Sequence, residues 1–74
     1  MRKPLYLIKF DFEKMLLLVQ SMNENYKTPL LLKVQGYKVS EIADFLNISP
    51  ENVKVRLHRA RKIILTGLEE NGNE

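Results

Sequence analysis

The sequence predicts an all-α fold, a small bundle of about four helices. Two observations predict it: four segments with helical features follow one another, and the short apolar stretch at residues 5–8 has no second strand with which to pair. A chain of 74 residues has room for one domain. We expect residues 11–68 to form that domain, residues 1–10 to form a lead-in or linker, and residues 69–74 to form a disordered acidic tail.

The composition excludes several classes of site. Hydrophobic residues make up 45% of the chain and charged residues 28%, which is typical of a globular protein. There is no cysteine and a single histidine, His58, so we expect no disulfide, no metal site and no cofactor. The sequence has no glycine-rich phosphate loop and no paired carboxylates in a catalytic pattern, so we do not expect an enzyme. No apolar run is long enough to span a membrane, and residues 1–9 do not resemble a signal peptide.

The first helix is expected over residues 11–22. Its apolar residues are too many for one narrow stripe, so the helix is either packed deeply or in contact with a partner. We interpret the apolar run at residues 15–18 mainly as core, with a groove for a partner helix as the alternative.

A second helix is expected over residues 26–35. Thr28 and Pro29 are tolerated in its first turn, and Gly36 lies where a left-handed residue commonly follows a helix. The three leucines at residues 30–32 are interpreted as core.

Two further helices are expected to form a helix-turn-helix. The third helix covers residues 39–46 and is followed by Asn47, the residue after glycine that best accepts the left-handed conformation. The fourth begins with Ser49 as N-cap and Pro50 in the first helical position, and should continue to about residue 65 or 68. Five apolar residues are expected to be buried together: Ile42, Leu46, Val53, Leu57 and Ala60. In such a motif the second helix enters the major groove of DNA.

Positive charge is concentrated on the fourth helix. The whole chain has a net charge of +3, whereas residues 50–62 alone carry five basic residues against one acidic residue, Glu51. On a helical wheel of about 100° per residue, the side opposite the apolar stripe is basic and carries Val55 and His58 at its centre. Such a face is typical of a protein that binds a polyanion, and a merely solvated helix surface is the alternative.

Two titratable residues on these helices have alternative interpretations. His58 has no carboxylate or nucleophile placed to partner it, so contact with a base or a phosphate is favoured over catalysis. Glu41 is interpreted as an ion-pair partner of Arg56 that orients the two helices, rather than as a catalytic acid.

Three strings in this part of the chain form a longer pattern than a generic helix-turn-helix needs. They are Glu41-Ile42-Ala43, Leu46-Asn47-Ile48-Ser49 and Asn52-Val53-Lys54-Val55-Arg56-Leu57-His58-Arg59-Ala60-Arg61. Together they closely resemble region 4 of bacterial sigma factors, in the version of the extracytoplasmic-function branch of the sigma-70 family. Residues 22–32 resemble the helix that precedes this motif in the family, and Gly36 resembles its connecting glycine, so that the resemblance covers residues 11–68.

The resemblance implies a DNA-binding module of transcription initiation that recognises a −35 promoter element and docks on the flap of the RNA polymerase β subunit. It also implies a bacterial, cytoplasmic protein, with an anti-sigma factor as a further candidate partner. The alternative is a stand-alone protein-interaction module that binds polymerase or an anti-sigma factor without reading promoters. Taken together, the resemblance and the helical wheel give these DNA-binding residues, of which the first two would meet phosphates: Lys38, Ser40, Asn52, Lys54, Val55, His58, Arg59 and Lys62.

The sequence departs from the family pattern at three points. Lys38 stands where the family often has a Ser or Thr cap, which makes that helix start weaker and more basic. Asn23 replaces a common proline. The 74 residues contain no counterpart of region 2, the part of the family that binds the −10 element and the polymerase clamp, so this polypeptide by itself is not expected to direct initiation.

Overall fold

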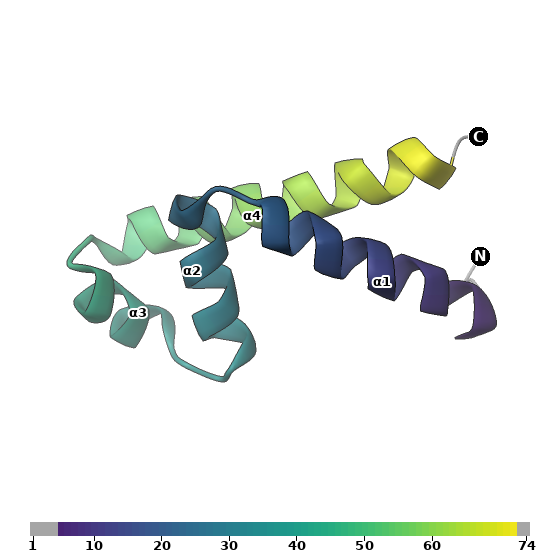
Figure 1. Ribbon diagram of the computed structural model, residues 1–74. Helices are drawn as coiled ribbons and strands as arrows, with labels where there is room; N and C mark the ends of the chain where they lie inside the picture. Colours follow the sequence, from purple (N-terminus) through teal and green to yellow (C-terminus); the bar gives the residue numbers. More distant parts are fainter. Residues whose placement is uncertain (1–4, 73–74) are drawn as a thin grey trace.

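Four helices make up the fold, as the sequence predicts. The computed structural model describes the backbone of residues 5–72 and the side chains of residues 13–69. The helices are α1 (Leu5–Ser21), α2 (Glu24–Val34), α3 (Val39–Leu46) and α4 (Pro50–Gly72), shown in Figure 1. The described residues contain no strand, which confirms the all-α fold class.

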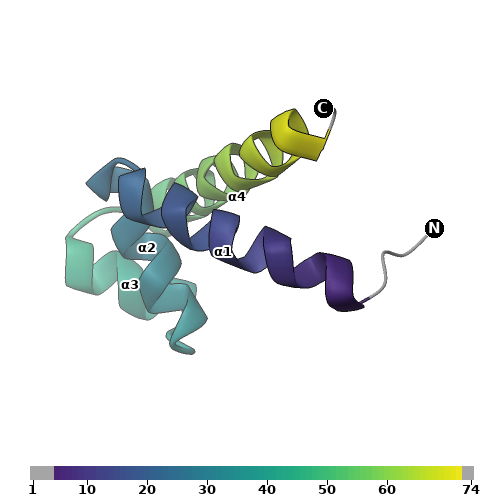
Figure 2. The ribbon, with the colours of Figure 1, turned by 45° about the vertical axis from the view of Figure 1, so that its right-hand side comes forward.

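The longest helix, α4, is the element against which the other three pack. Its first half lies against α2 and α3 and forms a compact body with them (Figure 1). Its second half extends out of this body next to α1, and the two helices diverge toward their free ends, as Figures 1 and 2 both show. The molecule is therefore elongated, with dimensions of 40 × 21 × 20 Å.

The two outer helices are longer than the sequence predicts. Residues 5–10 are the first turns of α1 where a lead-in was expected, and residues 69–72 are the last turn of α4 where a disordered tail was expected. The reason is that no partner strand competes for residues 5–8, and adding residues to an existing helix is favourable once the first turn has formed. The remainder of the expected lead-in and tail, residues 1–4 and 73–74, lies outside the described residues.

The start of α2 also differs from the prediction. The helix begins at Glu24 rather than Tyr26 because Asn23 acts as its N-cap, with its Oδ1 accepting the backbone N–H of Asn25 at 2.8 Å. Pro29 therefore lies in the second turn, not in the first, and cannot donate the hydrogen bond that this position normally makes. Its ring is fully buried, so packing offsets part of that loss.

A left-handed residue closes each of the two central helices. Gly36 has φ of 102° and follows α2, where the N–H of Tyr37 donates to the carbonyl of Leu32 at 3.2 Å. Asn47 has φ of 57° and follows α3, where the N–H of Ile48 donates to the carbonyl of Ala43 at 3.0 Å. Both are Schellman-type ends, and both confirm the position that the sequence assigns to the left-handed residue.

The core lies at the crossing of α3 and α4. Ile42, Ala43, Val53 and Leu57 are buried against one another, and partly buried residues of α2, α3 and the turn surround them: Leu30, Leu32, Val39, Leu46 and Ile48. Three of the five predicted core residues therefore lie in this cluster. Leu46 is only partly buried at its edge, and Ala60 is buried one turn farther along α4, outside the cluster.

Several leucines predicted to be core are exposed. Leu17 of α1 is 65% exposed, and Leu16 and Leu31 are also on the surface. Within its described part, α1 packs chiefly against α4, and Lys27 of α2 reaches it through a hydrogen bond to the carbonyl of Gln20 at 3.4 Å, so part of the α1 surface stays open. The core interpretation therefore fails for Leu16 and Leu17, and the residue of the run 15–18 that lines the groove described below is Leu18.

Candidate nucleic-acid interface

The start of α4 is fixed by the cap that the sequence predicts. The Oγ of Ser49 accepts the backbone N–H of Asn52 at 3.1 Å, and the carbonyl of Ser49 accepts the N–H of Val53 at 3.1 Å. Pro50 occupies the first helical position, where a missing N–H costs nothing. The turn from Asn47 to Ser49 therefore sets the direction in which α4 leaves α3.

One face of α4 is turned to solvent and carries the predicted DNA-binding side chains. Val53, Leu57 and Ala60 are buried, so the opposite side of the same helix is exposed. Val55 at the centre of that side is 44% exposed. The exposed side chains that the sequence assigned to DNA on this helix are Asn52, Lys54, Val55, His58, Arg59 and Lys62, which we call the outward face.

No carboxylate among residues 13–69 neutralises the cations of the outward face. The ion pair found among residues 13–69 joins Lys27 Nζ to Glu24 Oε2 at 3.2 Å, and both residues belong to α2. Lys54, Arg59 and Lys62 therefore have no carboxylate partner in that range. A face of this kind attracts a polyanion without first having to break internal pairs.

The two residues predicted at the start of α3 are both exposed. Lys38 is the N-cap residue, and Ser40 lies in the first turn. Neither residue lines either of the two hollows described below. The short turn that joins α3 to α4 is what holds the start of α3 in position relative to the outward face.

The predicted ion pair between Glu41 and Arg56 does not form, although the structure describes both side chains. Glu41 Oε1 instead accepts the backbone N–H of Lys38 at 2.8 Å. This is one half of a capping box, and the other half is missing because a lysine side chain has no acceptor. The carboxylate is held at the N-terminus of α3, where its negative charge interacts favourably with the helix dipole.

A polar hollow adjoins the outward face and brings in residues that the sequence did not indicate. It has a volume of about 250 Å³ and is lined by Asn25 and Tyr26 of α2 and by Asn52, Val55, Arg56 and Arg59 of α4. It thus joins Asn52, Val55 and Arg59 of the predicted site, whereas Lys54, His58 and Lys62 lie outside it. Because Asn25 and Tyr26 belong to another helix, the periodicity of α4 carries no signal for them.

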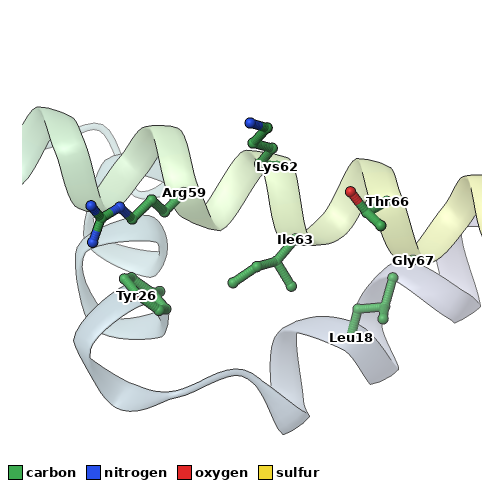
Figure 3. A pocket seen from close by; sticks show the side chains of 7 residues that line it. All are labelled: Leu18, Tyr26, Arg59, Lys62, Ile63, Thr66 and Gly67. Carbon is green, nitrogen blue, oxygen red and sulfur yellow. The ribbon is translucent and has the colours of Figure 1, made fainter.

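An apolar groove continues from the same place along the second half of α4. Its volume is about 580 Å³, and its lining residues are Leu18 of α1, Tyr26 of α2, and Arg59, Lys62, Ile63, Thr66 and Gly67 of α4 (Figure 3). Gly67 lets α1 come close, because a Cβ at this position would be 2.6 Å from Leu18 Cδ2. Tyr26 and Arg59 line both the groove and the polar hollow.

Comparison with known proteins gives one match. Residues 12–64 match the family model of sigma-70, region 4. No curated protein and no solved structure matches the chain. Separately, within residues 5–72 no helix is both long enough and apolar enough to cross a membrane.

Proposed function

Because the chain belongs to the sigma-70 region 4 family, we propose that it recognises a −35 promoter element through the outward face of α4 and docks on the β-subunit flap of RNA polymerase. The family consists of DNA-binding modules that interact with polymerase, and it is not a family of enzymes. We further propose that the protein acts in the bacterial cytoplasm, where promoters and polymerase are both present.

The observation that carries the DNA part of the proposal is the free positive charge of the outward face. Lys54, Arg59 and Lys62 have no carboxylate partner among residues 13–69. On the helical wheel Lys54 and Arg59 flank Val55 and His58, whose smaller or planar side chains can approach base edges. Lys38 and Ser40 at the start of α3 are proposed to contact phosphates, because the first helix of a helix-turn-helix crosses the sugar–phosphate backbone of the DNA.

The apolar groove supports the docking part of the proposal. Leu18 and Ile63 are apolar residues of its lining, and Ile63 is 38% exposed although it is a large apolar side chain. A groove of about 580 Å³ between helices accommodates the apolar face of a short partner helix. An anti-sigma factor with such a helix is the competing occupant.

A titration at two salt concentrations tests the DNA part. The full chain is mixed with a −35 duplex and with a scrambled duplex, and affinity is expected to fall steeply as salt increases, because phosphate contacts release counterions. Lys54→Ala should weaken both duplexes equally and reduce the salt slope by about 1. Arg59→Ala should cost about 1–3 kcal/mol on the −35 duplex alone.

Lys33→Ala serves as the matched control, since Lys33 is an exposed lysine of α2 outside the outward face. Binding of both duplexes with no salt dependence, and no effect of either α4 variant, contradicts the promoter proposal. In that case salt-insensitive binding of a flap fragment would leave the chain as a protein-interaction module.

A pair of matched variants tests the docking part. Ile63→Glu places a charge in the apolar groove, whereas Leu65→Glu places the same charge on an apolar residue of α4 that is 57% exposed and lies outside the groove. Flap-fragment binding should be lost in the first variant and retained in the second. Equal binding by both variants contradicts docking in this groove.

A further inference from the structure

We propose that Tyr26 is a positioning residue for Arg59 and so determines how precisely α4 reads DNA. The inference rests on the proposed function, and it adds to the DNA-reading helix a residue from α2 that the outward face does not contain. Tyr26 would act through the arginine and not by touching DNA.

The geometry brings the two side chains together at the junction of the two hollows. Tyr26 is half-buried near the start of α2, and Arg59 is exposed on α4. Both line the polar hollow and both line the apolar groove. In Figure 3 the guanidinium of Arg59 extends from α4 toward α2, on the side of the groove where Tyr26 lies.

No carboxylate in the described part of the chain holds Arg59 in this orientation. Glu24, at the start of the same helix as Tyr26, is occupied: its Oε2 pairs with Lys27 at 3.2 Å, and its Oε1 accepts the Thr28 hydroxyl at 3.3 Å. Asn25 and Asn52 also line the polar hollow, but neither is hydrogen-bonded to Arg59 among residues 13–69, and Tyr26 is the residue that lines both hollows together with Arg59. Its ring is therefore the group that we propose orients the guanidinium. Arginine is attracted to the face of a tyrosine ring and stacks on it with its planar head.

Orientation matters because a free arginine side chain has many rotamers. Fixing them on binding costs conformational entropy, and a contact that restricts them beforehand reduces this cost. A bidentate contact with a base also needs the guanidinium plane at a defined angle. Tyr26 would thus strengthen binding to the −35 duplex more than binding to a scrambled duplex.

A double-mutant cycle in the full chain tests the proposal. Tyr26→Leu removes the ring, Tyr26→Phe keeps it without the hydroxyl, and each is combined with Arg59→Ala. Tyr26→Leu should weaken the −35 duplex by about two- to fivefold, the range expected for one exposed cation–π contact. Tyr26→Phe should bind like the parent chain, and Tyr26→Leu should have no further effect in the Arg59→Ala background.

Three results overturn the proposal. If Tyr26→Phe loses as much affinity as Tyr26→Leu, the hydroxyl matters and the ring does not position Arg59. If Tyr26→Leu costs the same with and without Arg59, the two residues act independently. If Tyr26→Leu binds like the parent chain while Arg59→Ala is impaired, Arg59 needs no positioning, and the proposed DNA function still stands.

Folding is checked for each variant by its thermal unfolding midpoint. Should Tyr26→Leu not fold, Tyr26→Met replaces it, because methionine is flexible and favours helix. Failure of the proposed function is recognised separately, by the absence of any effect of Arg59→Ala on either duplex. The Tyr26 inference then fails with it.

Discussion

Asn47 sets the angle between the two helices of the motif. It has φ of 57°, a conformation that costs other non-glycine residues about 1–2 kcal/mol. We therefore expect Asn47→Ala to lower the free energy of unfolding by about that amount and Asn47→Gly to preserve it. Urea titration of the three proteins measures the difference, and an alanine variant as stable as the parent chain would contradict this account of the turn.

Leu57 is the residue whose loss should damage the core most clearly. It is buried with Ile42, Ala43 and Val53, so Leu57→Ala leaves a cavity and should cost about 2–5 kcal/mol. Val55→Ala on the same helix is the control, because Val55 is exposed and its truncation should change stability by less than about 0.5 kcal/mol. Similar unfolding midpoints for the two variants would show that the crossing of α3 and α4 is not the core.

Much of the site could be predicted at the scale of single residues, because local chemistry determines it. The cap at Ser49, the left-handed Asn47 and the burial of Val53 and Leu57 follow from residue type and from helical spacing, and all are confirmed. The pair of Glu41 with Arg56 was wrong because a nearer partner, the N–H of Lys38, takes the carboxylate. The spacing of residues in the sequence does not show which of the two donors, the Lys38 N–H or the Arg56 guanidinium, the carboxylate binds.

At the scale of the element, α3 has an incomplete cap that a single substitution can complete. Lys38→Ser supplies a hydroxyl that can accept the N–H of Glu41 while the Glu41 carboxylate keeps its bond to the residue 38 N–H. The free energy of unfolding should rise by about 1 kcal/mol. If Lys38 contacts phosphate, the same variant should bind DNA more weakly, with a salt slope reduced by about 1.

These two effects of Lys38→Ser are measured independently, by urea unfolding and by duplex titration. Lys38→Ala is the control, since it removes the charge without supplying an acceptor. A serine variant no more stable than the alanine variant contradicts the capping argument. A serine variant that binds DNA like the parent chain contradicts the phosphate contact, whatever its stability.

The helix α4 contains a glycine whose role is spacing rather than flexibility. Gly67→Ala should gain up to about 1 kcal/mol of helix propensity, and its Cβ should push the end of the Leu18 side chain, which borders the open groove. We expect little net change in stability and weaker binding of a flap fragment. The comparison uses Leu65→Ala, on the same helix and outside the groove; equal flap binding by both would show that the close approach of α1 does not shape the docking site.

At the scale of the whole molecule, the sequence could not predict where the outer helices lie. The apolar residues of α1 indicated burial, but α1 packs chiefly against α4, and Leu16 and Leu17 are exposed. Likewise, the groove and the polar hollow are formed by side chains from helices far apart in sequence, such as Leu18 with Gly67 and Tyr26 with Arg59. Periodicity within one helix carries no signal for such pairs.

Because α4 is one continuous helix, it fixes the orientation of the outward face relative to the groove. Its 23 residues form one rod of about 35 Å. The outward face lies on the first half, Ile63, Thr66 and Gly67 of the groove lie on the second, and Arg59 and Lys62 belong to both. The angle about the helix axis between the outward face and the groove is therefore fixed, because each residue of an α-helix turns the chain by about 100°.

A single alanine inserted after Lys62 would leave the outward face in place and turn Ile63 and Gly67 away from α1. Such a variant should still bind a −35 duplex and should no longer bind a flap fragment. The two activities would then be separated by rotating one half of the helix relative to the other, with no side chain removed.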